Sequence, residues 1–146
     1  MPKDSHTETD DFYFRMVAQH THEGLIVTDA KSRVVWANTP FLRRTGYGLE
    51  ELVGRTPGET LYGPMTSDEA KADIEEARRT RRPAKVEVEV QRKDNTPYWA
   101  EVSLFPVFDE NGTHTHFISV ERDVTTRREQ EARTAEIIEN ERHREE

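Results

Sequence analysis

Cysteine is absent from this sequence of 146 residues. Disulfide bonds, thiol nucleophiles and every other reaction at a cysteine sulfur are therefore excluded. Long apolar runs are absent too, since no stretch approaches the ~20 residues that a membrane-spanning helix needs. The N-terminal segment MPKDSHTETDDF also lacks the apolar stretch that a signal peptide contains. We therefore expect a cytoplasmic chain with no membrane partner.

Positive charge is outnumbered, with 21 lysines and arginines against 29 aspartates and glutamates, a formal net charge of −8. Such a chain is repelled by phosphate, so unaided binding to nucleic acid is disfavoured. Catalytic motifs are missing as well: there is no P-loop, no nucleophile elbow and no HExxH. We therefore expect no enzyme, and any enzymatic activity would lie in a downstream effector that this chain does not contain.

The sequence does contain clear strand and helix patterns. AKVEVEVQR alternates valine with glutamate, which is typical of a strand buried on one face. Asn38 and Gly46 fit the start and end of a short helix between them, and Glu110-Asn111-Gly112 fits a hairpin turn. Strands are predicted at residues 24–29, 33–37, 84–92, 98–108 and 115–124, and the main helices at 11–22, 39–45, 67–80 and 124–146.

This order predicts an α+β fold: a five-stranded antiparallel sheet with short helices over one face, flanked by N-terminal and C-terminal helices. We divide the chain into four parts. They are a disordered tail at residues 1–10, a flanking helix at 11–22, the sheet-containing domain at 23–123, and a linker or coiled-coil helix at 124–146.

Four phrases carry a family resemblance: GLIVTDAKSRVVWAN, FLRRTGYGLEELVGR, RKDNTPYWAEVSLFPVFDENG and FISVERDVT. Their order resembles the PAS domain family of sensors, and GYGLEELVGR with YWAEVSLFPV is similar to its flavin-binding LOV branch. The resemblance implies a pocket between the sheet and the short helices, and signalling through the flanking helices. Asp123, Val124 and Thr125 match the family's junction between the last strand and an output helix, so they are the predicted signal-relay residues.

The cofactors of the family are judged by the residues that stand at the matching positions. A LOV domain needs a cysteine in the loop after Gly54-Arg55, and this loop has none. Its flavin-contacting asparagines and glutamine correspond here to Val90, Ala100 and Glu121. A PAS haem site needs a histidine ligand, and the helix at 67–80 contains none. We therefore predict no cofactor, with flavin and haem both disfavoured, and no catalytic or metal-binding residues.

Glu121 has two interpretations, because a strand shifted by one residue turns it to the other face. If it faces the pocket, its pKa should be raised and it could bind a cationic or hydrogen-bond-donating ligand. If it does not face the pocket, it faces solvent or pairs with an arginine. We favour this second interpretation. The pocket candidates are Ile26, Val35, Phe41, Val88, Val90, Leu104, Ile118 and Glu121.

Other residues also allow two readings. The pairs His20/His22 and His114/His116 could each bind a metal if they share a strand face, but exposed loop and hairpin positions are favoured. Trp36 and Trp99 could stack on a ligand, but packing in a core or interface is favoured.

These expectations combine into a sensory module, the input domain of a bacterial signal-transduction protein. The expected partners are a second copy of the chain, a small hydrophobic ligand, and an effector domain that is a histidine kinase or a diguanylate cyclase or phosphodiesterase. Two alternatives stay open. One is a ligand-free dimerisation module, and the other is a flavin-based light or redox sensor with contacts unlike those of LOV domains.

Overall fold

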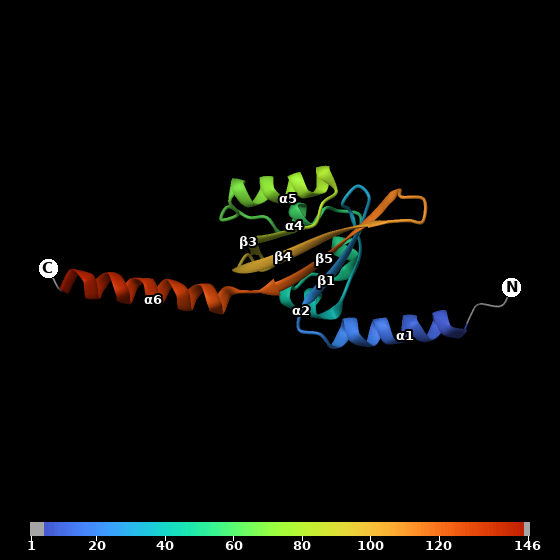
Figure 1. Ribbon diagram of the computed structural model, residues 1–146. Helices are drawn as coiled ribbons and strands as arrows, with labels where there is room; N and C mark the ends of the chain where they lie inside the picture. Colours follow the sequence, from blue (N-terminus) through green and yellow to red (C-terminus); the bar gives the residue numbers. More distant parts are fainter. Residues whose placement is uncertain (1–4, 145–146) are drawn as a thin grey trace.

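The computed structural model describes residues 5–144 and contains a five-stranded antiparallel sheet (Figure 1). The order of strands across the sheet is β2-β1-β5-β4-β3, which places the last strand of the chain in the middle. This confirms the predicted α+β fold class. The strands are β1 Gly24–Asp29, β2 Val34–Ala37, β3 Ala84–Gln91, β4 Pro97–Phe108 and β5 His114–Asp123.

The helices lie on both sides of this sheet and beyond it. Figure 1 shows α5 over one face, α1 on the opposite side of the domain, and α6 extending away from the end of β5. No helix within the described residues 5–144 is long and apolar enough to cross a membrane. The helices are α1 Ser5–His20, α2 Thr39–Thr45, α3 Leu49–Leu52, α4 Pro57–Leu61, α5 Asp68–Thr80 and α6 Thr125–Arg144.

The terminal helices differ from their predicted bounds. α1 begins at Ser5, so residues 5–10, predicted as part of a disordered tail, are helical. It ends at His20 instead of residue 22. Residues 1–4 of the predicted tail, and residues 145–146 of the predicted C-terminal helix, lie outside the described part of the chain.

The core lies between the sheet and helices α2 to α5. Phe41, Leu52, Val88 and Tyr98 are each at most 2% exposed there. Alternation along β3 sends its valines into this layer and leaves Glu87 and Glu89 on the other face, as predicted. One face of the sheet is therefore covered by helices, while the other is largely open.

Asn38 holds the N-terminal part of this layer together, and its side chain is fully buried. Its Oδ1 accepts from the amides of Leu25 (2.9 Å) and Phe41 (3.1 Å), so it caps α2 as predicted and also fastens β1. Its Nδ2 donates to the carbonyl oxygens of Ala18 (2.6 Å) and Glu23 (3.1 Å). One amide therefore joins the end of α1 to β1 and α2.

Candidate functional site

A cavity of about 50 Å³ lies between the helix-covered face of the sheet and helices α4 and α5. Most of its wall is aliphatic, with a carboxylate, a hydroxyl, a phenol and a guanidinium among the lining groups. The lining residues are Ile26, Phe41, Pro57, Leu61, Tyr62, Ile74, Ala77, Arg78, Ala84, Val86, Val88, Val90, Val102, Leu104, Ser119 and Glu121.

The structure places six of the eight predicted pocket residues around this cavity: Ile26, Phe41, Val88, Val90, Leu104 and Glu121. The other two, Val35 and Ile118, are 44% and 38% exposed and do not line it. Strand alternation explains Ile118, because Ser119 and Glu121 face the cavity and an even-numbered neighbour must face outward. The prediction for Val35 and Ile118 is therefore wrong.

Several lining residues escaped the sequence analysis. Ile74, Ala77 and Arg78 come from α5, at the three- and four-residue spacing of one helical face. That spacing was available as a signal, since the stripe of small and apolar residues on α5 has to meet the sheet. Tyr62 follows α4 in a loop, where no periodicity could have indicated its position.

Glu121 is 2% exposed and lies in the cavity wall. Its Oε1 accepts a hydrogen bond from the Tyr98 hydroxyl (2.8 Å) and forms an ion pair with Nη1 of Arg44 (3.1 Å). The two sequence interpretations are thus both partly realised: the side chain faces the pocket, and it pairs with an arginine. Only the idea that it faces solvent is wrong.

The electrostatics of this group follow from its burial. Loss of hydration raises the pKa of the Glu121 carboxyl above its ordinary value, although the Tyr98 hydrogen bond and the Arg44 charge act in the opposite direction. Burial and the neighbouring carboxylate also raise the pKa of the Tyr98 phenol, which stays neutral and donates its proton. The cavity therefore contains a carboxyl group whose charge is favoured by the Tyr98 hydrogen bond and by the positive charge of Arg44.

Arg44 extends this network to the chain before β1. Its Nη1 donates to the backbone oxygen of Glu121 (3.0 Å), and its Nη2 donates to the backbone oxygen of His22 (2.7 Å). His22 lies between α1 and β1. The cavity carboxylate, the end of α2 and the exit from α1 are therefore joined by one guanidinium.

The three predicted relay residues lie where β5 continues into α6. Asp123 accepts from the amide of Thr125 (3.0 Å), and Val124 is 6% exposed and donates its amide to the carbonyl of Trp99 (2.8 Å). Thr125 in turn accepts from the amide of Trp99 (2.8 Å). The junction is thus hydrogen-bonded to β4 on both sides of Val124.

The histidine pairs do not form a binding site. His114 is 7% exposed and packs between the rings of Phe108 (5.6 Å) and Phe117 (4.3 Å), whereas His116 is exposed. A bulge between Val107 and Phe108 disturbs the pairing here, so the expectation that His114 is exposed is wrong. Within the described residues, no group of three or more potential ligands could hold a metal ion.

Neither tryptophan lines the cavity. Trp36 contacts the ring of Phe14 from α1 at 6.4 Å, and Trp99 lies under the guanidinium of Arg128 at 3.5 Å. Both therefore serve packing between a flanking helix and the sheet, the interpretation that was favoured.

Comparison with known proteins gives one family model, described as a PAS domain, which matches residues 22–126. A blue-light-activated histidine kinase of Rhizobium johnstonii is 33% identical over 86% of this chain and 36% of its own length. A blue-light photoreceptor of Listeria monocytogenes is 33% identical over 70% of this chain and 41% of its own length. A nitrogen fixation regulatory protein of Klebsiella oxytoca is 28% identical over 77% of this chain and 22% of its own length. The chain thus spans less than half of each of these relatives.

Solved structures show the same fold. An RNA-binding light-oxygen-voltage receptor matches with a TM-score of 0.82 and 25% identity, covering all of this chain and 42% of that one. A light-oxygen-voltage domain studied with a flavin analogue matches with a TM-score of 0.72 and 22% identity, covering 93% of this chain and 98% of that one.

These comparisons contradict the prediction of no cofactor, in which flavin was disfavoured. Two relatives are blue-light photosensory proteins, and the fold is shared with a domain studied with a flavin analogue, so the findings point to a flavin-binding family. The prediction rested on the absent cysteine and on three substituted side chains, whereas the similarity to these proteins extends over most of the chain.

Proposed function

Since this chain belongs to the PAS domain family, with relatives among regulators and histidine kinases, we propose that it is a sensory input module. A ligand held between the sheet and α5 changes the position of α6, which carries the change to an effector. One observation supports this most directly: β5 contributes Ser119 and Glu121 to the cavity wall and then enters α6 after Val124. The sensing surface and the output helix thus belong to one continuous segment.

We propose a flavin as the occupant of the cavity. Aliphatic groups from the sheet, such as Val88, and from the helices, such as Leu61 and Ile74, suit the faces of a flat ring. Arg78 offers a positive charge for an anionic substituent, and Glu121 with Ser119 offers polar contacts for the ring. At about 50 Å³ the cavity is smaller than the roughly 300–1,000 Å³ that bury a drug-sized ligand, so lining side chains must move outward for a ring to enter.

A flavin supplies light absorption and electron transfer when bound. This chain has no cysteine, so no bond between a cysteine sulfur and the flavin ring can form. The protein's own part is the buried carboxyl of Glu121, which Tyr98 and Arg44 hold in place at the cavity wall. Protonation of that carboxyl weakens its pairing with Arg44, and this is the group we propose to couple the pocket to the surrounding backbone.

Flavin binding is testable with the purified chain and flavin mononucleotide. After incubation and gel filtration, the protein fraction is expected to keep the blue-region absorbance of flavin at about one flavin per chain. Val88→Phe, which fills the cavity, is expected to lose the flavin absorbance. Glu89→Gln changes a side chain on the outer face of β3, away from the cavity, and is expected to keep the absorbance. Complete separation of flavin from the protein would contradict the proposal. If mass spectrometry then also found no copurified small molecule, a ligand-free interaction module would replace it.

The effector is proposed from the relatives. One relative is a histidine kinase, and the chain covers only 36% of it, which leaves room there for an output domain. We propose a histidine kinase or a cyclic-di-GMP enzyme as the effector, no enzymatic activity in the present chain, and a cytoplasmic location for the whole.

We also propose that the module is a homodimer formed through the open face of the sheet. Ile118 pairs with Phe105 on one side and with Val27 on the other, so three apolar side chains lie next to one another across β1, β5 and β4. Phe105 and Ile118 are 45% and 38% exposed, and α1 adds the exposed Phe12 and Tyr13. Apolar groups gathered in this way mark an association surface.

Static light scattering tests this interface. Ile118→Glu is expected to halve the molar mass in solution, because the charge would be buried between two copies. Ile137→Glu on α6 is the control and is expected to leave the mass unchanged. A loss of mass with Ile137→Glu alone would instead assign the dimer to a coiled coil of α6 helices.

A further inference from the structure

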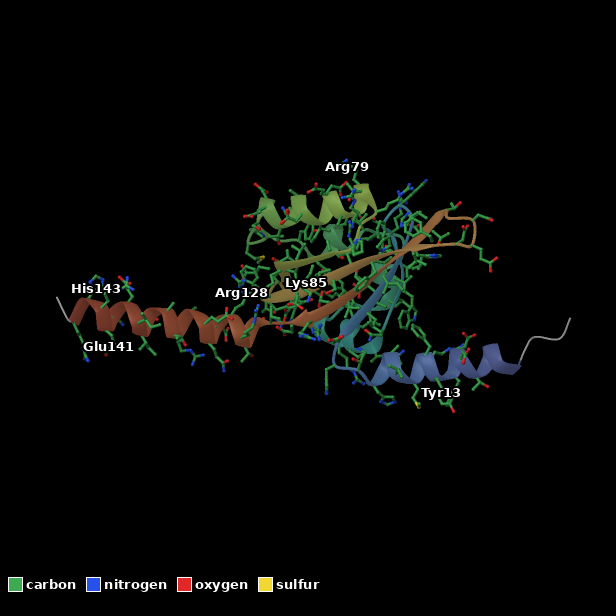
Figure 2. All side chains as sticks on the ribbon, in the orientation of Figure 1. Tyr13, Arg79, Lys85, Arg128, Glu141 and His143 are labelled. Atoms are coloured by element: carbon green, nitrogen blue, oxygen red, sulfur yellow. The ribbon has the colours of Figure 1, made fainter. Side chains whose placement is uncertain are left out.

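Within the described residues, the hydrogen bonds, ion pairs and ring contact that join α6 to the sheet come from its first turn. No residue of α6 is buried. Arg127 and Arg128 both reach Oε1 of Glu87 on β3, at 2.6 Å and 2.8 Å, and the guanidinium of Arg128 lies 3.5 Å from the centre of the Trp99 ring on β4. Figure 2 shows Arg128 where α6 meets the sheet, whereas Glu141 and His143 lie far along the helix. The direction of α6 therefore depends on this small cluster, together with the backbone bonds of Val124 and Thr125 to Trp99.

Glu87 lies on the face of β3 that points away from the cavity. Its neighbours Val86 and Val88 line the cavity on one face of β3, and Glu87 projects from the other. β3 is an edge strand, paired only with β4, so it can shift without a second partner to oppose it. An outward movement of Val86 or Val88 therefore displaces the carboxylate that holds α6.

The ion pairs of Glu87 with Arg127 and Arg128 can orient α6, and they can also open. Glu101 lies directly opposite Glu87 on β4, and two like charges at such a pair repel. The two arginines offset that repulsion and lower the pKa of the Glu87 carboxyl. The Glu87, Arg127 and Arg128 side chains are 30%, 46% and 38% exposed, and ion pairs open to water to this degree are easily exchanged for hydration.

We propose that Glu87, with Arg127, Arg128 and Trp99, forms a latch that passes displacement of the cavity wall to the output helix. Glu87 is the positioning residue of this latch. The inference rests on the proposed function, because it names the contact through which the pocket controls α6. It adds residues outside the predicted relay segment, which ended at Thr125.

Spin labelling tests the latch without any ligand. Because the chain contains no cysteine, Asn111→Cys in the β4–β5 turn and Glu136→Cys in α6 provide two selective labels. Pulsed electron paramagnetic resonance then reports their separation, with labelled chains diluted in unlabelled protein to exclude distances between copies. Glu87→Gln is expected to broaden the distance distribution, while Glu89→Gln on the same face of β3 is expected to leave it narrow.

A latch must also respond to the cavity, which a purely structural contact would not. Val88→Phe adds volume at the cavity wall. In a chain that keeps Glu87, it is expected to shift the distance between the two labels. In a chain that also carries Glu87→Gln, it is expected to leave that distance unchanged. If circular dichroism shows that Val88→Phe does not fold, Val86→Leu takes its place. An unchanged distance in the folded variant, or the same shift with and without Glu87, would overturn the proposal. Since no flavin is used, this result is independent of whether flavin binds.

Discussion

Replacing Arg44 by alanine is expected to lower the free energy of unfolding by about 3–5 kcal/mol at neutral pH, because a buried ion pair loses one partner. Nη1 of Arg44 lies 3.1 Å from Oε1 of Glu121, and the side chains are only 14% and 3% exposed. The substitution leaves the carboxylate in the core, where the Tyr98 hydroxyl still donates a hydrogen bond to it but no cation balances its charge. Glu121 must then be protonated or the region must open.

The loss should depend on pH with a defined sign. Burial already raises the Glu121 pKa above its ordinary value of 4.5, and removal of the arginine raises it further. A folded state with a raised carboxyl pKa binds more protons than the unfolded chain, so its stability falls as pH rises from 4.5 through the folded pKa. Acidification toward 4.5 is therefore expected to narrow the stability difference between Arg44→Ala and the wild type.

Urea unfolding at neutral pH and near pH 4.5, a value set by the ordinary pKa, measures both effects. The double variant Arg44→Ala/Glu121→Gln removes the buried charge and is expected to recover part of the loss. Lys93→Ala is the surface control, because its pair with Glu51 is 53% and 37% exposed and should contribute less than about 1 kcal/mol. A loss that is equal at both pH values would show that Glu121 is not charged in the fold.

Asn38→Asp is expected to cost about 2–6 kcal/mol, because it leaves two carbonyl groups without donors, at roughly 1–3 kcal/mol each. The aspartate keeps an oxygen for the amides of Leu25 and Phe41 but offers none of the protons that Ala18 and Glu23 accept. The side chain is fully buried, so water does not replace the lost contacts. We expect the end of α1 to separate from β1 first.

Urea unfolding and limited proteolysis between α1 and β1 measure this result. Ser67→Ala is the matched control, since Ser67 caps α5 through a single bond to Ala70 (3.1 Å) and should cost about 1 kcal/mol. If Asn38→Asp lowered the free energy of unfolding no more than Ser67→Ala does, the hydrogen bonds from Nδ2 to Ala18 and Glu23 would not be holding α1 in place.

The sheet could be predicted because its signals are local. Strict alternation in AKVEVEVQR and the Asn-Gly turn before β5 specify strands and a hairpin from neighbouring residues alone. The site required long-range information. Arg44 and Glu121 are 77 positions apart, and they meet because α2 packs against β1, which pairs with β5. The bulge that separates His114 from His116 likewise arises from pairing with β4 and has no signature in the sequence of β5.

The cofactor prediction failed for a different reason. Val90, Ala100 and Glu121 were judged one by one against the polar contacts of LOV domains, and each looked unsuitable. Six of the eight predicted pocket residues do line the cavity, but the residues that α4 and α5 contribute were missing from the prediction. Similarity over most of the chain carried information that three side chains did not.

Occupancy of the cavity is proposed to move α6, and the labelled pair Asn111→Cys/Glu136→Cys tests this in a titration with flavin mononucleotide. Flavin mononucleotide is expected to shift the distance between the two labels in the wild-type chain, and the shift is expected to be lost in Val88→Phe, which fills the cavity. Flavin that binds at about one molecule per chain and leaves the distance distribution unchanged would contradict this movement of α6.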